Sequence, residues 1–467
     1  MKIRLLLLPT AMLLAACRLG PDFQVPGATG GAGWKEGKTT PAASLPDEWW
    51  RLFNDSELNT LVNRALSSNN DLVAAKARVD TARALVGVDR ARLFPTLDLA
   101  GSAGISRNSQ SGTITSNLPP GVAINLENQL YRGSFDLAYD PDLWGRNKRL
   151  IEAASAQAAA SEALLDSQRL GIATEVARQY FTLRGLDAQE IVLNDTLKSR
   201  EDALSIQKSR ADAGLTDGLA TTRARTEMEL ATGDLAAVQR QRGSAEHALA
   251  VLCGTRPSAF SVSKRSINKT LPSIRAGLPA QVLGRRPDVR AAEQELRSAN
   301  ARIGVAEAAF YPNFNLITSA GLESIDAKDF LNWENRILSL GTNLAAPILD
   351  GGANRANYQA ARSRYDEVLA RYRQTLLIAL REVEDSLVDL KGLAKSRAAL
   401  ERALSSANDT RNISQERYDK GLSSYLEVVD ADRTVLQTRL ALRQQEAQQR
   451  ISLAAFAKAL GGGWSGK

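Results

Sequence analysis

Few side chains in this sequence could carry out covalent or metal chemistry. The 467 residues include one histidine, His247, and two cysteines, Cys17 and Cys253. Ser–His and Cys–His sites and histidine-based zinc sites need imidazole as base or ligand, so a single histidine argues against all three. The sequence also lacks a glycine-rich loop ending in Lys-Ser or Lys-Thr and any CxxC pair. We therefore expect no catalytic residues, no metal site and no cofactor. We expect His247 to be an ordinary helical residue and Cys253 a buried thiol.

Charged residues after Gly421-Leu422 are a second group of candidates. Leu426, Asp430 and Arg433 are spaced by four and then three residues, so on a helix they share one face, with Glu427 beside it. Carboxylates on such a face could attract cations. The same side chains could also be solvated helix charges, and their spacing leaves both readings open.

The amino terminus is typical of a bacterial secretory signal. Two basic residues precede an apolar run from Leu5 to Ala16, which is too short to span a bilayer. The run ends at Leu14-Ala15-Ala16-Cys17, which resembles a lipobox, where cleavage occurs before an acylated cysteine. We therefore predict a signal peptide at residues 1–16, acylation (including palmitate) at Cys17 and a lipid-anchored extended segment at 17–56. The alternative is a plain signal peptide.

Composition and charge narrow the class further. Hydrophobic residues make up 44% of the chain but aromatic residues only 5%, which favours helices rich in Ala, Leu and Val. The net charge is +7 without any block of like charge, so we expect no nucleic-acid partner. After the signal peptide, no apolar run reaches 18 residues, so any membrane entry must use lipid or a closed β-barrel.

The remaining chain is an internal duplication. Ala213-Gly214-Leu215-Thr216 matches Lys420-Gly421-Leu422-Ser423, and the segment after Phe94-Pro95 matches the segment after Tyr311-Pro312. The offset is nearly constant, which indicates a duplicated unit. We predict a first repeat at 57–254, a linker at 255–286 and a second repeat at 287–464.

Each repeat contains two segments with alternating side chains. The period of two predicts strands at about 95–106, 131–140, 312–321 and 337–346. In the second strand Phe135 and Leu137 fall on one face and Asp136 on the other. Ten-residue strands of this kind span membranes, although a half-buried soluble hairpin alternates in the same way.

Four strands per chain are too few to close a barrel. Open strand edges are not tolerated in lipid, and small closed barrels need about eight strands. Membrane insertion would therefore require an oligomer, and three copies would supply twelve strands.

Very long helices separate the strand pairs. Residues 147–213 and 353–420 contain no proline, and each stretch would form a helical rod of about 100 Å. Shorter helical stretches are predicted at about 57–92, 219–252, 288–309 and 426–460. The fold is thus mainly α with a small β part.

Ordered motifs run along the whole chain. They are Cys17 with Gly20-Pro21-Asp22-Phe23, Trp49-Trp50 with Phe53, Phe135-Asp136-Leu137 with Pro141-Asp142-Leu143-Trp144-Gly145, and Leu283-Gly284-Arg285-Arg286-Pro287-Asp288-Val289-Arg290. Through them, residues 17–464 resemble the TolC-like outer-membrane efflux factors, in the lipoprotein (OprM- and NodT-like) branch.

The resemblance implies a passive export conduit in the outer membrane of a Gram-negative bacterium. It implies a homotrimer with a twelve-stranded transmembrane barrel on a helical periplasmic tunnel. This tunnel would accept small molecules, as in multidrug resistance, from a periplasmic adaptor and an inner-membrane pump. The alternative is a lipid-anchored periplasmic coiled-coil scaffold without a pore.

The resemblance also implies roles for individual residues at the periplasmic tip. Leu426 would form an apolar ring, Asp430 an acidic ring and Glu427 a second acidic position, while Arg433 would link helices in the closed state. The turns that would contact the adaptor are Gly214, Leu215, Gly421 and Leu422. In the first repeat, Ala220 and Arg223 replace the two acids, so one acidic set per chain is expected.

Overall fold

The computed structural model describes residues 18–27, 33–36, 45–109, 126–267 and 270–462. Cys17 and the predicted signal peptide, residues 1–16, lie outside the described residues. The described chain divides into two compact units. The first unit takes in Asp80–Ala159 and Glu293–Ala370, and the second takes in Pro26–Val79, Ala160–Ala292 and Arg371–Lys467. Each unit contains residues of both sequence repeats.

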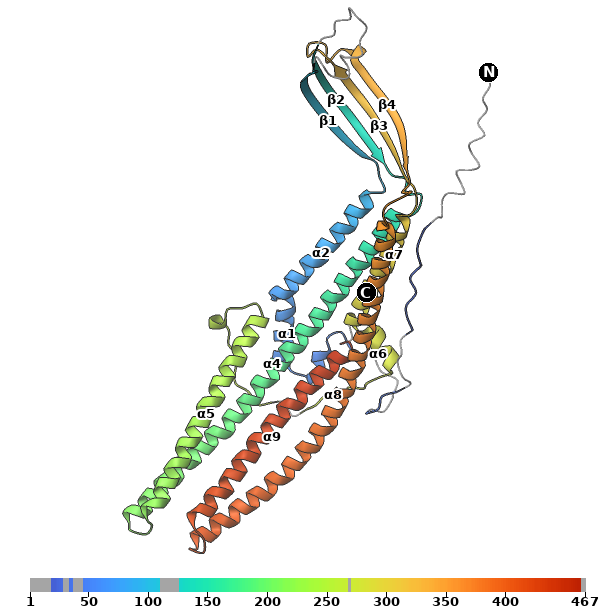
Figure 1. Cartoon of the computed structure of the whole chain (residues 1–467). Coiled ribbons are helices and arrows are strands. Elements are labelled where there is room, and N and C mark those ends of the chain that lie inside the picture. The colour runs from blue at the N-terminus through green and yellow to red at the C-terminus, as the bar shows by residue number, and fades with distance from the viewer. Residues whose placement is uncertain (1–17, 28–32, 37–44, 110–125, 268–269, 463–467) are drawn as a thin grey trace, which may run out of the picture. The chain divides into compact units, whose positions relative to one another are not determined.

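Helices and strands alternate in the same order in both repeats (Figure 1). The first repeat contains α1 (Ser56–Ser68), α2 (Asn70–Ala91), β1 (Thr96–Arg107), β2 (Glu127–Tyr139), α4 (Arg146–Asp212) and α5 (Gly218–Leu252). The second contains α7 (Pro287–Ala308), β3 (Asn313–Ser324), β4 (Arg336–Ala345), α8 (Ala353–Asp419) and α9 (Tyr425–Ala459). The described part of the predicted linker includes a short 3-10 helix (Pro257–Ala259) and the short α-helix α6 (Pro279–Arg285).

The first unit contains one antiparallel sheet in the order β1-β2-β3-β4. Its central pair joins the two repeats, because β2 pairs with β3 from Tyr131 opposite Ser324 to Tyr139 opposite Leu316. β1 and β4 are the outer strands, so one edge of each has no partner within the described chain. The strands lie at the predicted positions, except that β2 begins earlier, at Glu127, and β3 ends later, at Ser324.

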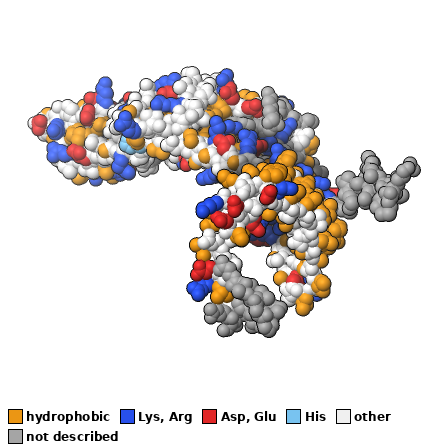
Figure 2. All heavy atoms as spheres, turned by 90° about the horizontal axis from the view of Figure 1, so that it is seen from above, with side chains coloured by type: hydrophobic (Ala, Val, Ile, Leu, Met, Phe, Trp, Pro, Cys, Tyr) orange, Lys and Arg blue, Asp and Glu red, His pale blue; other side chains and the backbone are white. Residues whose placement is uncertain are grey.

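The register divides the sheet into an apolar and a polar face. Leu97 lies opposite Leu137 and Leu99 opposite Phe135, so the apolar residues of neighbouring strands coincide. Leu97, Leu99 and Phe135 are exposed in the chain, at 64%, 74% and 55%, and Leu137 is half-buried. Figure 2 shows hydrophobic side chains gathered along one side of the region that contains the sheet. The predicted alternation of Phe135 and Leu137 against Asp136 is confirmed.

The polar face carries a hydrogen-bonded group of side chains. Asp136 accepts hydrogen bonds from Ser319 at 2.5 Å and from Ser134 at 3.3 Å. Arg132 donates to Ser319 and lies 3.6 Å from Glu323. Asp136 and Ser319 come from the paired strands β2 and β3, so this polar face extends across the junction between the repeats.

An aspartate a few residues before the start of each long helix caps its first turn. Asp142 accepts hydrogen bonds from the backbone N–H groups of Asn147 and Lys148, both at 2.9 Å. Asp350 accepts from Asn354 at 2.8 Å, and this backbone N–H group holds the pKa of Asp350 below its ordinary value. Carboxylates satisfy the free N–H groups of a helix start. From these caps, α4 and α8 each run for 67 residues, as the absence of proline predicted.

The first predicted helix is interrupted where one continuous stretch was expected. Asn69 has an extended backbone between α1 and α2, and its side chain accepts hydrogen bonds from the N–H groups of Asp71 and Leu72. It also donates to the carbonyl of Leu252. Asparagine is a strong helix-start residue, and this tertiary contact stabilises the break.

The core of the second unit lies along the long helices. Tyr180, Leu183 and Leu193 of α4 are fully buried beside Trp49 and Trp50. On α8, Tyr372, Leu376, Ala379 and Val383 follow one another at intervals of four, three and four residues, and all four are buried along one face. Among the described helices, none is both long enough and apolar enough to cross a membrane.

Candidate functional site

The two Gly-Leu turns of the second unit have the same geometry. Gly214 and Gly421 adopt φ angles of +70° and +72°, which favour glycine. The following N–H groups of Leu215 and Leu422 return to the carbonyls of Arg210 and Arg417 and close the ends of α4 and α8. Leu215 is 75% exposed and Leu422 66% exposed. Each turn therefore presents one apolar side chain to its surroundings.

The predicted gate residues lie together on the first turns of α9. Leu426, Glu427, Asp430 and Arg433 are all exposed, whereas Val428 and Val429 between them are buried. The side chain of Asp430 is 62% exposed and lies 3.8 Å from that of Arg433. The structure therefore brings the four predicted residues onto one exposed side of the helix, as their spacing indicated.

Arg433 has a closer partner that the sequence reasoning missed. Its Nε donates at 2.9 Å to Glu227 of α5, a residue only 6% exposed. This hydrogen bond raises the pKa of Arg433 above its ordinary value. Glu227 lies in a stripe of buried residues with Ala224 and Ala231. A charge within such a stripe is the sequence signal that could have identified it.

The ion pairs continue from Glu227 to the other helices. Arg200 of α4 lies 3.6 Å from Glu227 and 3.3 Å from Asp432. Asp432 in turn accepts a hydrogen bond at 3.0 Å from Arg411 of α8. Arg411, Asp432, Arg200, Glu227 and Arg433, which we name the tip network, therefore connect α8, α9, α4 and α5 within one chain.

Aromatic contacts support the tip network from the side of the turns. Tyr418 donates to Gln207 at 3.0 Å, and its ring centroid lies 5.4 Å from that of Tyr425. Arg210 lies over the Tyr418 ring at 5.2 Å. These contacts join α8 and α9 to α4, so the ends of the two helix pairs are held together by polar and aromatic groups.

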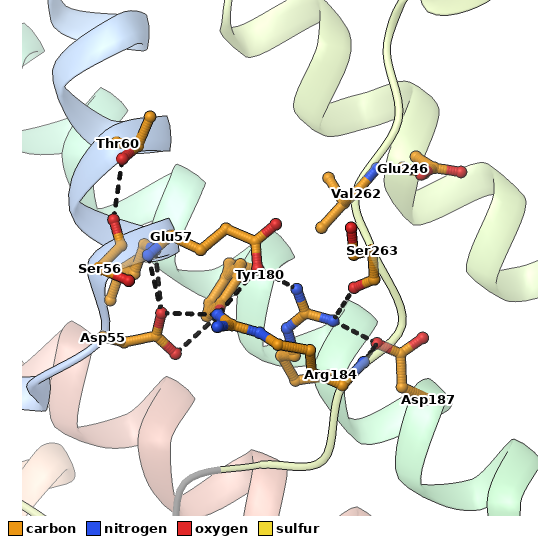
Figure 3. A network of polar contacts seen from close by, with 12 residues as sticks. Asp55, Ser56, Glu57, Thr60, Tyr180, Arg184, Asp187, Glu246, Val262 and Ser263 are labelled. Atoms are coloured by element: carbon orange, nitrogen blue, oxygen red, sulfur yellow. Dashed lines mark hydrogen bonds and ion pairs between the residues drawn. The ribbon is translucent and has the colours of Figure 1, made fainter.

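A second polar cluster ties the linker to the helices (Figure 3). Arg184 of α4, 2% exposed, donates to Glu57 at 2.6 Å and to the carbonyl of Ser263 at 2.7 Å, and it pairs with Asp187. Tyr180 donates to Asp55 at 2.6 Å. Burial, reinforced by this hydrogen bond, raises the pKa of Tyr180 to about 12. The cluster therefore serves packing, with its charges compensated.

In the first unit, the chain that follows Cys17 is held in place. Arg149 of α4, 1% exposed, donates to the carbonyls of Leu19 and Gly20, both at 2.8 Å. Gly20 has φ +86°, and a Cβ there would lie 2.4 Å from the Cα of Gly304. Asn300 of α7 donates to the carbonyl of Pro21. We name residues 18–23 the amino-terminal strap.

The remaining reactive residues have ordinary surroundings. His247 is exposed on α5, and no group of three or more potential metal ligands occurs among the described residues. Cys253 is fully buried with its thiol 3.6 Å from the carbonyl of Leu61, and burial raises its pKa. It is the buried structural thiol that the sequence predicted.

Comparison with known proteins identifies the family. The pattern of the outer membrane efflux protein family matches residues 61–255 and 278–462. The chain belongs to this family. The first matched segment corresponds to the first repeat and the second to the second repeat. The family relationship predicted from the motifs is confirmed.

Full-length relatives and solved structures agree with this assignment. OprJ of Pseudomonas aeruginosa is 31% identical over 458 residues, covering 97% of this chain and 94% of OprJ. The toluene efflux pump outer membrane protein TtgI of Pseudomonas putida is 32% identical over all of this chain and 99% of TtgI. The outer-membrane channel OprN superposes with a TM-score of 0.88 at 29% identity, over 96% of this chain and 100% of the OprN chain. The chain is an outer-membrane efflux channel protein with the predicted fold class.

Proposed function

We propose that three copies of the chain form a passive conduit through the outer membrane, which receives small molecules from a periplasmic adaptor and an inner-membrane pump. The observation that carries this proposal is the four-stranded sheet with two free edges and one exposed apolar face. Free strand edges require partners in lipid, and an apolar outer face suits the hydrocarbon. Three sheets joined edge to edge supply twelve strands.

The names of relatives support the assignment to a pump system. SrpC of Pseudomonas putida is named as a solvent efflux pump outer membrane protein, and CusC of Escherichia coli as a cation efflux system protein. Relatives that share this chain's length thus serve pumps with very different cargo. The conduit therefore supplies a path, and we assign it no catalytic residue.

We further propose that the tip of the second unit is the gate. Threefold repetition would place three Asp430 carboxylates near one another, with Leu426 and Glu427 on the same exposed side of α9. Like charges at close range would concentrate cations and oppose anions. The tip network would hold α5 and α9 together in the closed state, and Gly214, Leu215, Gly421 and Leu422 would contact the adaptor. Cys17 would carry the lipid anchor.

Two measurements on the purified full-length protein test the conduit. The trimer should migrate as one species in mild detergent gels and separate into single chains on heating. In planar bilayers it should give single-channel conductance steps. A heat-sensitive trimer without conductance would instead support the pore-less coiled-coil scaffold.

A further inference from the structure

We propose that a cavity of the second unit, lined by α4, α8, α9 and the linker residues Ser266 and Ile267, binds a small organic molecule that carries a phosphate or sulfate group. The cavity has a volume of about 630 Å³. Four arginines contribute to its lining: Arg397, Arg439, Arg443 and Arg450. This site lies outside the gate and the strands, and the proposal does not depend on channel activity.

The arginines converge because of their spacing on α9. Arg439, Arg443, Glu446 and Arg450 follow one another at intervals of four, three and four residues, so they share one face of the helix. Arg397 approaches from α8, with its guanidinium 3.4 Å from the amide oxygen of Gln449. Guanidinium groups from two helices therefore line a single hollow.

The cavity lining has more positively charged than negatively charged side chains. Its carboxylates are Asp195 and Glu446, against four guanidinium groups. Glu446 accepts a hydrogen bond from Arg443 at 2.9 Å. Arg397 also donates to Glu401, which lies outside the lining. A ligand with two negative charges would balance the lining itself.

Arg450 is the most deeply buried of the four arginines. Its side chain is 2% exposed, and its Nη1 donates at 2.6 Å to the backbone carbonyl of Glu446. Burial lowers the pKa of Arg450, the carboxylate of Glu446 opposes this effect, and the positive charge of Arg397 adds a smaller lowering effect. Burying a guanidinium in a poorly solvated place is unfavourable unless other groups compensate its charge. A bound oxyanion would add to the compensation that Glu446 already provides.

The shape and remaining lining define the ligand class. Guanidinium forks match the oxygen atoms of phosphate and sulfate in pairs of hydrogen bonds. The volume lies within the roughly 300–1,000 Å³ of small-molecule pockets and exceeds the needs of a lone inorganic ion. Ile191, Val192 and Leu404 supply an apolar wall. The fitting ligand therefore combines an apolar body with a dianionic group.

Titration calorimetry of the full-length protein at low ionic strength tests the site, with phenyl phosphate as probe. We expect saturable binding to the wild type, competition by inorganic phosphate and no comparable binding of phenol. The double variant Arg439→Gln/Arg443→Gln should weaken binding at least tenfold, since two charge-assisted contacts are lost. Arg381→Gln/Arg417→Gln removes two arginines of α8 outside the cavity and should leave binding unchanged.

Each contrary result overturns the proposal. Phenyl phosphate could fail to bind the wild type, or bind the cavity variant as tightly as the control variant. Equal binding of phenol would show that the apolar wall alone is responsible. Binding of a glutamate decapeptide without binding of phenyl phosphate would assign the arginines to a protein partner. Single-channel conductance, measured in parallel, reports the proposed conduit separately, and circular dichroism spectra show that both variants fold.

Discussion

At the residue scale, Asp430 and Glu227 make different contributions to the tip. Asp430 is largely exposed and stands 3.8 Å from Arg433, whereas Glu227 is buried and receives a 2.9 Å hydrogen bond from the same arginine. An exposed carboxylate acts mainly on ions in solution, and a buried ion pair acts mainly on the helices that carry it. Selectivity and closure should therefore separate by mutation.

We expect Asp430→Ala to reduce the cation preference of single trimers by roughly a factor of two or more, because three charges leave one ring. Resting conductance should change little, since Arg433 keeps Glu227. Reversal potential in a salt gradient and mean conductance measure the two effects. The control is Asp409→Ala, which removes an exposed carboxylate farther along α8. Wild-type selectivity in both variants would show that Asp430 is a solvated surface charge.

Glu227→Gln should instead change resting conductance and leave cation preference intact. It leaves Arg200 and Arg433 without the carboxylate between α4, α5 and α9, and loosens these helices by roughly 1–3 kcal/mol. Resting conductance should rise while cation preference stays near the wild-type value. A matched control is Glu229→Gln, which removes an exposed carboxylate two residues along α5. If Glu227→Gln channels stay as closed as those of the control, the tip network does not hold the gate.

At the element scale, the two faces of the sheet allow a sharp comparison. Leu137→Arg would place a charge on the apolar face and should destabilise the trimer by roughly 2–4 kcal/mol near mid-membrane. Asp98→Arg lies on the polar face, directly opposite Asp136, where a new ion pair offsets the change. Heating gels report the temperature at which each trimer separates. Equal losses in both variants would mean that the proposed lipid-facing side is incorrect.

The elements were more predictable than the contacts between them. Alternation and the absence of proline are local signals, so β1, β3, α4 and α8 could be located from the sequence. The shared face of Leu426, Asp430 and Arg433 followed from helical spacing alone. Glu227 could not be paired with Arg433 because the two lie in different repeats. The break at Asn69 depends on a contact with Leu252, which is 183 residues away in the chain.

At the scale of the whole molecule, the lipid on Cys17 and the strands would attach the protein to the membrane independently of each other. Cys17→Ala should abolish incorporation of labelled palmitate, whereas Cys253→Ala should leave it unchanged because that thiol is buried. Trimers of Cys17→Ala should still form, because the sheet and the amino-terminal strap remain. Labelling and gel migration measure both outcomes. Equal labelling of Cys17→Ala and wild type would contradict acylation at this residue.

The pairing of β2 with β3 has a consequence for biogenesis. Tyr131 can pair with Ser324 only after α4, α5 and α7 have been synthesised and exported. The sheet therefore cannot be completed while the first repeat is entering the periplasm. Pairings between distant segments form slowly. Until then, the hairpin of β1 and β2 lacks its partner strands β3 and β4. Its exposed Leu99 and Phe135 make it prone to aggregation. Delivery across the periplasm thus calls for a chaperone that shields the first hairpin until the second arrives.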